Sequence, residues 1–329
     1  MLKLICLLSV ALTGAMIPFG AFVRLKNAGL SCPDWPLCYG QLLPPEGFEI
    51  ALETGHRFVG FILGILIIAI NFVAFLQPRY SKLRKLALTT FILVSIQGIL
   101  GALTVTMVLW PPIVTLHLLG GNILLGILVY LTVLSFYTSE EKSKIVEGTP
   151  NRLNKNKSKE KKRMFWMLAI LLIMITSGGY NSTTSSGYHC EAFPGCHEKS
   201  AFSFGMSGTD VSALSGIEGH ILSPAPKEFQ GRFLPVFENE WIHMLHRLIA
   251  ICGGMILILM SWFWLKNKQD YKLIGISFIS LIILEILIGI INAVLRLPAP
   301  VSATHTAIAA ILTSLLFFIL ADIQIKNEN

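Results

Sequence analysis

Charged side chains are scarce in this sequence. Asp, Glu, Lys and Arg make up 14% of its 329 residues, and only 19 residues are acidic. Soluble globular domains carry about 25% charged residues, so this composition excludes an ordinary soluble domain. The six cysteines include no Cys-x2-Cys pair, which removes the spacing of the commonest zinc sites.

Hydrophobic residues make up 53% of the chain, and they gather in runs of about 20 residues, the length at which a helix crosses a bilayer core. The first run could be a signal peptide, but it is long and lacks a small-x-small cleavage site before Arg24, so we interpret it as a retained helix. The sequence predicts eight transmembrane helices, at about 2–23, 55–76, 86–108, 114–137, 164–180, 242–265, 273–295 and 301–323.

The basic residues are sorted among the loops. Of the 26 Lys and Arg, 18 fall at Lys3, Lys326 and in the stretches 77–85, 138–163 and 266–272. By the positive-inside rule this side is cytoplasmic. Both termini then lie in the cytoplasm, which agrees with an even number of helices. We expect a multi-pass protein of the cell (plasma) membrane with its cysteine-bearing loops outside.

The two halves of the chain carry the same residue types at nearly the same offsets, and such self-similarity signals an internal repeat. The matching positions are Gly20 and Gly178, Gly29 and Gly187, Cys32-x5-Cys38 and Cys190-x5-Cys196, His56-Arg57 and His246-Arg247, Gln97-x3-Gly101 and Glu285-x3-Gly289, and His117 and His305. Each unit holds four helices, so both enter the membrane in the same orientation, about an axis along the membrane normal.

The fold class follows from this repeat: an all-α integral membrane protein of eight helices, built as two pseudo-symmetric four-helix bundles. We expect the halves at residues 1–137 and 164–329, joined by a polar, basic cytoplasmic linker at 138–163. The second unit has about 32 extra residues in its outer loop, within 197–240.

Four histidines fall near the outer ends of predicted helices: His56, His117, His246 and His305. A single one could merely hydrogen-bond a neighbour at the membrane interface. However, ionisable residues inside a membrane are costly, and four at repeated positions and equal depth favour a functional role. Zinc prefers a compact tetrahedral set with cysteine or carboxylate, whereas paired imidazoles from facing helices suit six-coordinate haem iron. The sequence predicts one haem in each half.

Residues beside these histidines support a flat ligand. Small residues follow each histidine by four positions, where they leave room for a porphyrin or serve close helix packing, two readings of equal weight. They are Gly60, Gly121, Ala250 and Ala309. Arg57 and Arg247 could pair with haem propionates or anchor their helices at the headgroups, and we favour the propionate role.

Two cysteine pairs, Cys32/Cys38 and Cys190/Cys196, lie in predicted outer loops, where the compartment is oxidising. Two disulfides are the natural interpretation. A disulfide there could staple the loop or pass electrons, and the sequence favours stapling.

One carboxylate distinguishes the two halves. Glu53 lies three residues before the first histidine, and its counterpart in the second unit is His243. Positions three apart share a helix face, so we expect different chemistry at the two sites. Glu53 could transfer protons, support the histidine or pair with Arg57, and we favour proton transfer. Arg24 also has an uncharged counterpart, Ser182.

These residues resemble haem A synthases, membrane enzymes that supply haem A to cytochrome oxidases. The resemblance covers nearly the whole chain, and the two cysteine pairs are of the type found in many bacterial members. The second cysteine loop is less similar and its insertion is long, which leaves the role of that disulfide open. The matching segments are Arg24-x4-Gly29-Leu-Ser-Cys-Pro-Asp-Trp-Pro-Leu-Cys38, Glu53-x2-His56-Arg57, Gln97-x3-Gly101-Ala-x-Thr-Val105, His117, His243-x2-His246-Arg247 and His305.

The resemblance implies oxidation of a ring methyl of haem O, through an alcohol, to the formyl group of haem A. It implies a substrate haem in the N-terminal half and a permanent haem B in the C-terminal half. His56 and His117 would then ligate haem O, and His246 and His305 haem B. Glu53 would be the catalytic carboxylate, and the Cys32–Cys38 disulfide would be tied to activity.

Two other function classes fit the same residues. A dihaem b-type cytochrome would move electrons between a quinone and a partner, and a haem transporter or assembly factor would bind haem without chemistry. Only the synthase predicts that Glu53→Ala gives folded, haem-loaded, inactive protein. The sequence names neither the electron acceptor nor the oxygen source, nor the oligomeric state. Besides haem O and membrane lipid, a haem O synthase is a candidate partner.

Overall fold

The computed structural model describes residues 1–42, 44–137, 153–190, 193–196, 235, 237–266 and 271–328. Within these ranges, eight helices are long and apolar enough to cross a membrane, which confirms the predicted fold class. They are α1 (Leu2–Leu25), α2 (Phe48–Leu76), α3 (Arg84–Thr106), α4 (Pro111–Phe136), α5 (Leu153–Thr183), α7 (Glu238–Leu265), α8 (Lys272–Val294) and α9 (Ala299–Glu328).

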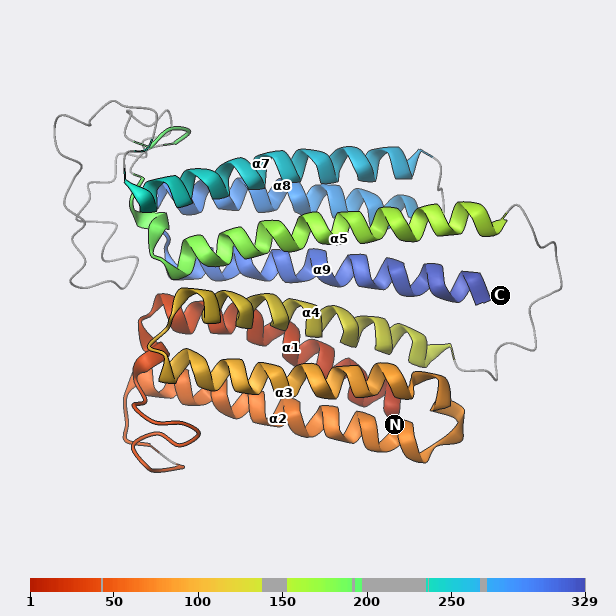
Figure 1. The fold of residues 1–329 in the computed structure, drawn as a ribbon, viewed down its shortest axis with the longest axis horizontal. Helices are drawn as coiled ribbons and strands as arrows, with labels where there is room; N and C mark the ends of the chain where they lie inside the picture. Colours follow the sequence, from red (N-terminus) through yellow and green to blue (C-terminus); the bar gives the residue numbers. More distant parts are fainter. Residues whose placement is uncertain are drawn as a thin grey trace.

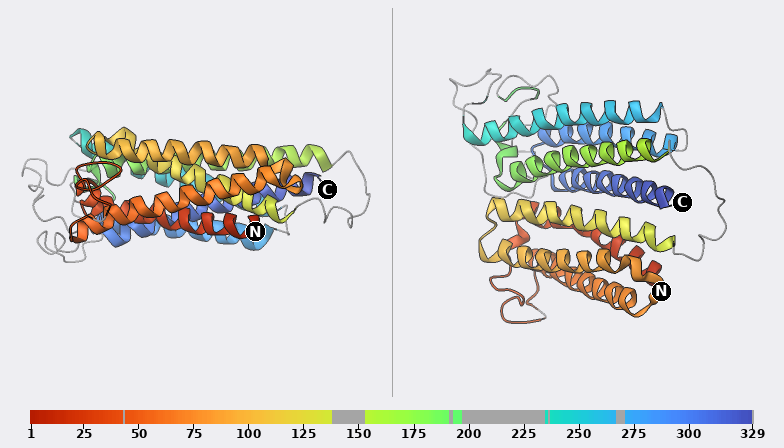
Figure 2. Two further views of the ribbon diagram at one scale, coloured as in Figure 1. Left: turned by 90° about the horizontal axis from the view of Figure 1, so that it is seen from below. Right: turned by 45° about the vertical axis from the view of Figure 1, so that its right-hand side comes forward.

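The helices form two bundles that lie side by side with their axes roughly aligned (Figures 1 and 2). In the N-terminal half, α1 to α4 pack in a ring in which each helix contacts the next and α4 contacts α1. In the C-terminal half, α5, α7, α8 and α9 pack in the same order. Contacts between α4 and α9, α1 and α9, and α4 and α5 join the halves. This pattern maps onto itself when the halves are exchanged, as a two-fold pseudo-axis requires.

Each bundle has its own hydrophobic core. Leu63, Ile67 and Leu128 belong to the core of the N-terminal half, and Leu171 and Phe278 to that of the C-terminal half. Large apolar side chains also cover the outward faces of the helices, where they suit contact with lipid.

The backbone repeats the same unusual conformations in both halves. Six residues other than glycine adopt left-handed dihedral angles at matching places, in the turn after the first helix and in the loop between the third and fourth. The pairs are Asn27 and Ser185, Val108 and Arg296, and Leu109 and Leu297. At Gly187 a Cβ atom would lie 2.5 Å from Leu297 Cδ1, so the close approach of these two segments requires glycine there.

Local sequence accounts for the helix starts. Pro111 opens α4, where its missing N–H leaves no helical bond unmade. At the start of α7, the Phe237 N–H donates to Glu240 Oε2 over 3.0 Å, a contact in which a side chain caps the first turn of the helix.

The fifth helix begins at Leu153 rather than at 164, so residues 153–163 of the expected linker are helical. Lys and Glu are good helix formers and extend the helix beyond its apolar segment, which the hydrophobic pattern alone could not indicate. Residues 138–152 of the expected linker, and 197–234 of the expected insertion, lie outside the described residues.

Candidate functional site

One end of the molecule bears the disulfide loops, and we call it the disulfide end; α2, α4, α7 and α9 begin there (Figure 1). Both chain termini lie toward the opposite end, the termini end. Each histidine comes within a few turns of the first residue of its helix, His56 on α2, His117 on α4, His246 on α7 and His305 on α9. They therefore occupy a common depth in the bundles.

Within each half, the structure brings the two histidines together. His56 and His117 come from α2 and α4, helices at opposite corners of the N-terminal ring, and the Nδ1 atoms of both are buried. His246 and His305 come from α7 and α9, at opposite corners of the C-terminal ring. Each half thus carries two histidines on facing helices at a common depth, a set of side chains that suits ligation of a haem iron.

A glycine of the preceding helix lies behind each imidazole. A Cβ atom built on Gly20 would lie 3.1 Å from His56 Cε1, and one on Gly101 would lie 3.5 Å from His117 Cε1. In the C-terminal half, the corresponding distances are 2.9 Å from Gly178 to His246 and 3.2 Å from Gly289 to His305. Sequence analysis matched these glycines between the halves but did not assign them a role; the repeat itself was the available signal.

The imidazole environments fit a haem-binding role. The Nδ1 atoms of His56 and His117 are buried and have no hydrogen-bond partner among the described residues. A buried polar atom without a partner is destabilising, so these two rings retain bonding capacity that the described residues do not use. Across the same described part of the chain, no three His, Cys, Asp or Glu side chains group closely enough to hold a metal ion alone.

Glu53 is 4% exposed, and both of its oxygens accept hydrogen bonds. Arg57 Nη2 donates to Oε1 over 2.5 Å, and the Cys32 backbone N–H donates to Oε2 over 2.8 Å. Arg57 Nη1 also donates to the carbonyls of Asp34 and Leu37, over 2.8 and 2.6 Å. The carboxylate and the guanidinium thus tie the first disulfide loop to α2. The ion pair is one of the alternatives that the sequence left open.

The C-terminal half repeats this arrangement without the carboxylate. Arg247 Nη1 donates to the carbonyls of Pro194 and Gly195, over 3.2 and 3.0 Å. Its Nε donates to His243 Nε2 over 3.2 Å, in the position where Arg57 meets Glu53. Both arginines therefore hold a loop, but only Arg57 pairs with a carboxylate four residues before it.

Both predicted cysteine pairs lie at bonding distance. The S–S distance is 2.00 Å for Cys32–Cys38 and 2.22 Å for Cys190–Cys196, which confirms the two disulfides.

Arg24 at the end of α1 donates a hydrogen bond to Ser182 on α5, the residue that sequence analysis identified as its own counterpart. Tyr188 lies close enough to feel the Arg24 charge; burial raises the pKa of the Tyr188 hydroxyl, and the charge partly opposes that shift. A side chain that touches its counterpart lies near the pseudo-axis. The Arg24 charge, which the second half lacks, therefore lies near the pseudo-axis between the two bundles.

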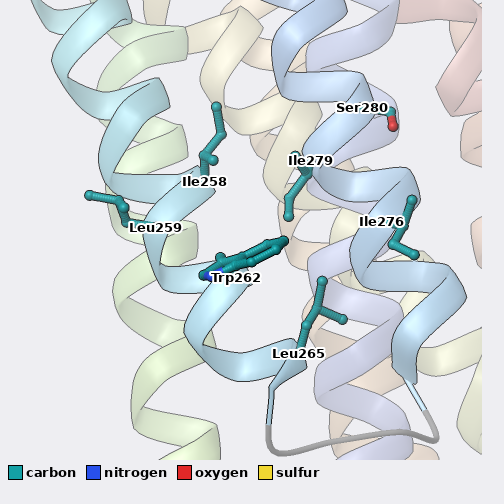
Figure 3. A pocket seen from close by; sticks show the side chains of 7 residues that line it. All are labelled: Ile258, Leu259, Trp262, Leu265, Ile276, Ile279 and Ser280. Atoms are coloured by element: carbon teal, nitrogen blue, oxygen red, sulfur yellow. The ribbon is translucent and has the colours of Figure 1, made fainter.

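An apolar groove of about 450 Å³ lies between α7 and α8 toward the termini end. Trp262 points from α7 toward Ile279 of α8, and Ser280 is the one polar side chain among the groove's lining residues (Figure 3). The groove is remote from the histidines and offers no group that could ligate iron, so it is not part of the site.

The fold and the site together define a class: a multi-pass membrane protein with an internal repeat, in which each half carries facing histidines beneath a disulfide-bonded loop. The sequence model of the COX15-CtaA family, described as cytochrome oxidase assembly proteins, matches residues 3–317, and the chain belongs to this family.

Several relatives align over nearly the whole chain. The haem A synthase of Shewanella oneidensis is 30% identical over 323 residues, which are 93% of this chain and 91% of that protein. The haem A synthase of Bacillus pumilus is 23% identical over 98% of this chain and 96% of its own length. That of Alkalihalophilus pseudofirmus is 26% identical over 91% of this chain and 89% of its own.

Proposed function

We propose that this protein is a haem A synthase, an oxidoreductase that converts a methyl group of haem O to the formyl group of haem A for cytochrome oxidase assembly. Family membership and relatives of that name support the activity. The observation that carries it is the difference beside the two arginines: buried Glu53 bonds Arg57 and the Cys32 N–H in the first half, whereas its counterpart His243 bonds Arg247 in the second. A dihaem cytochrome whose haems both serve electron transfer gives no reason for that difference.

In this proposal the two histidine pairs hold different haems. His56 and His117 bind the substrate haem O, and His246 and His305 hold a resident haem B. When bound, haem B supplies one-electron redox chemistry at its iron. The assignment rests on Glu53, whose counterpart beside the other histidine pair is His243, a side chain without a carboxylate.

Glu53 takes up protons that the methyl group releases as it is oxidised, which is the work of a positioned general base. Arg57 and the Cys32 N–H fix the direction of both carboxylate oxygens. The disulfide loop covers this residue and restricts access of water. The source of the oxygen atom and the electron acceptor are partners still to be found, and a haem O synthase is a candidate donor of the substrate.

The arginines have a second role in this proposal. Arg57 and Arg247 stand next to the ligand histidines, at the end of the bundles where propionates would be neutralised. A guanidinium has five N–H donors, so one that holds a loop carbonyl can also pair with a carboxylate. Each arginine would then join its haem to its loop.

The positive-inside rule supports an orientation in the cell membrane. The basic residues beside the described helix ends gather at the termini end, so we propose that this end is cytoplasmic. The histidines and the disulfide loops would then lie toward the outer face, where disulfides persist.

Pigment analysis of the purified protein tests the function. The haems are extracted, separated and identified by mass. We expect haem B together with haem O or haem A. Haem B alone, after co-expression with a source of haem O, would favour a dihaem cytochrome instead. Protein that binds no haem would contradict the histidine assignment.

A further inference from the structure

The first histidines of the two pairs differ in what their rings contact. Residues 19 and 177 are counterparts, each directly before the glycine that supports the ring. In the N-terminal half this residue is Phe19, whose ring lies 5.6 Å from the His56 ring at an interplanar angle of 60°. In the C-terminal half it is Ser177, whose Oγ lies 3.0 Å from His246 Nδ1.

The second histidines differ in the same sense. Glu285 is 8% exposed, and its Oε2 lies 3.2 Å from His305 Nδ1. The counterpart of Glu285 is Gln97, which is equally buried but lies against Gly120, where a Cβ atom would be 2.0 Å from the amide Nε2. Neither Gln97 nor any other described residue bonds Nδ1 of His117. In the C-terminal half, Nδ1 of His246 has a hydrogen-bond partner, and Nδ1 of His305 has a carboxylate at ion-pair distance, without hydrogen-bond geometry. In the N-terminal half, neither Nδ1 atom has a hydrogen-bond partner among the described residues.

A partner on Nδ1 changes how an imidazole holds a metal. Bonding of the Nδ1 hydrogen fixes the tautomer, directs the Nε2 lone pair at the metal and raises its basicity. Loss of such a partner typically lowers metal affinity 10- to 100-fold. A carboxylate has the largest effect, because it makes the ring a stronger electron donor. A phenyl edge provides no acceptor.

We propose that Ser177 and Glu285 retain the haem of the C-terminal half, and that Phe19 and Gln97 keep the haem of the N-terminal half exchangeable. This inference rests on the proposed function, in which one haem enters as substrate and leaves as product while the other stays. Ser177, Glu285 and Phe19 are positioning residues, since each contacts a ligand histidine, whereas Gln97 acts by leaving His117 without a carboxylate. They deepen the division between the sites, which otherwise rests on Glu53 alone.

Haem transfer to a scavenger tests retention directly. Haem-loaded protein is mixed with an excess of apomyoglobin, and the haem that remains is identified by mass over time. In the unaltered protein, haem O or haem A should leave at least ten times faster than haem B. Ser177→Ala and Glu285→Gln should each speed haem B loss by about 10- to 100-fold. Ser261→Ala removes a buried serine of the same half near the termini end of α7 and should change nothing.

A redox titration provides a readout that a purely structural role would not move. Glu285→Gln keeps the side-chain shape but removes the negative charge, so the midpoint potential of haem B should rise. A tenfold shift in the ratio of reduced to oxidised haem at a fixed potential corresponds to 59 mV for one electron. Gln97→Glu, the reciprocal change, should slow loss of the N-terminal haem and lower its potential.

The outcomes separate this inference from the proposed function. Equal release of both haems from the unaltered protein would overturn the inference. Unchanged haem B loss and potential in Ser177→Ala and Glu285→Gln would also overturn it. Either result leaves the synthase assignment standing if haem A is still made. If Glu285→Gln does not fold, Gln97→Glu decides, because unchanged release of the N-terminal haem would contradict the inference.

Discussion

Arg57 and Glu53 form an ion pair of 2.5 Å on one face of α2, and the other oxygen of the same carboxylate accepts the Cys32 N–H. A cysteine of a disulfide loop and a buried acid are therefore one hydrogen-bond apart. Changes to the loop should reach the acid, and changes to the acid should loosen the loop.

Glu53→Gln should lower haem A formation by about 10²- to 10⁴-fold, because the amide cannot take up a proton. Haem content should stay near that of the unaltered protein, since the histidine ligands are intact. Glu49→Gln, one turn earlier on α2 and exposed, is the matched control. The measurement is the haem A fraction in extracted pigment; haem A at normal levels in Glu53→Gln would remove this residue from the mechanism.

Cys32→Ser with Cys38→Ser should also lower haem A formation, by about 10- to 100-fold. The open loop no longer holds the Cys32 N–H on Glu53, and a hydrogen bond to a charged group is worth about 1.5–3 kcal/mol. Haem B should remain bound. Cys252→Ser, which removes an exposed free thiol on α7, should have no effect. If the loop variant makes haem A at the normal rate, the loop does not position the acid.

Gly178→Ala should reduce haem B content. The added methyl would lie 2.9 Å from His246 Cε1 and must displace the ring. Overpacking of this kind destabilises by about 1–3 kcal/mol. Gly101→Ala is the contrasting variant, because its methyl would lie at an ordinary 3.5 Å from His117 Cε1. The ratio of haem to protein is measured for both variants. Equal ratios in Gly178→Ala and Gly101→Ala would show that the His246 ring does not need the space that Gly178 leaves.

Alkaline pH should destabilise the termini end. Burial, together with a hydrogen bond from the hydroxyl to Asp322, raises the pKa of Tyr271 from 10.0 to about 12. Because the folded-state pKa is the higher one, this stabilisation is complete below pH 10 and is lost as the pH rises through about 12. Unfolding temperatures from pH 9 to 12 should therefore fall more steeply for the unaltered protein than for Tyr271→Phe. If the unfolding temperatures of the two proteins fall equally with pH, ionisation of Tyr271 does not destabilise this end.

Sequence patterns alone predicted the helices and the disulfides, and they assigned two candidate histidines to each half. The length of the apolar runs defines the helices, and the charge bias of the loops defines their orientation. The repeat groups His56 with His117, because His246 and His305 recur at the same positions of the second half. The contacts of each ring could not be predicted. Whether Phe19 or Gln97 reaches a histidine depends on how α1 and α3 rotate against their neighbours, and no periodicity within one helix specifies that.

The loop-binding role of Arg57 was missed for a related reason. Its partners are backbone carbonyls of Asp34 and Leu37, and a backbone carbonyl has no sequence signature. The sequence does hold one signal for this role: in both halves an arginine directly follows the histidine, and a cysteine loop precedes that histidine.

The contact between Arg24 and Ser182 has a consequence for how such a fold can exist. In an assembly of two identical chains, the same residue would stand on both sides of the axis. Two arginines there would repel one another, and two serines would leave no positive charge at the centre of this end. One chain that carries both halves can place a cation on one side and its hydrogen-bond acceptor on the other. Because the two halves belong to one chain, the residues on the two sides of the pseudo-axis can differ, although the bundles around them are alike.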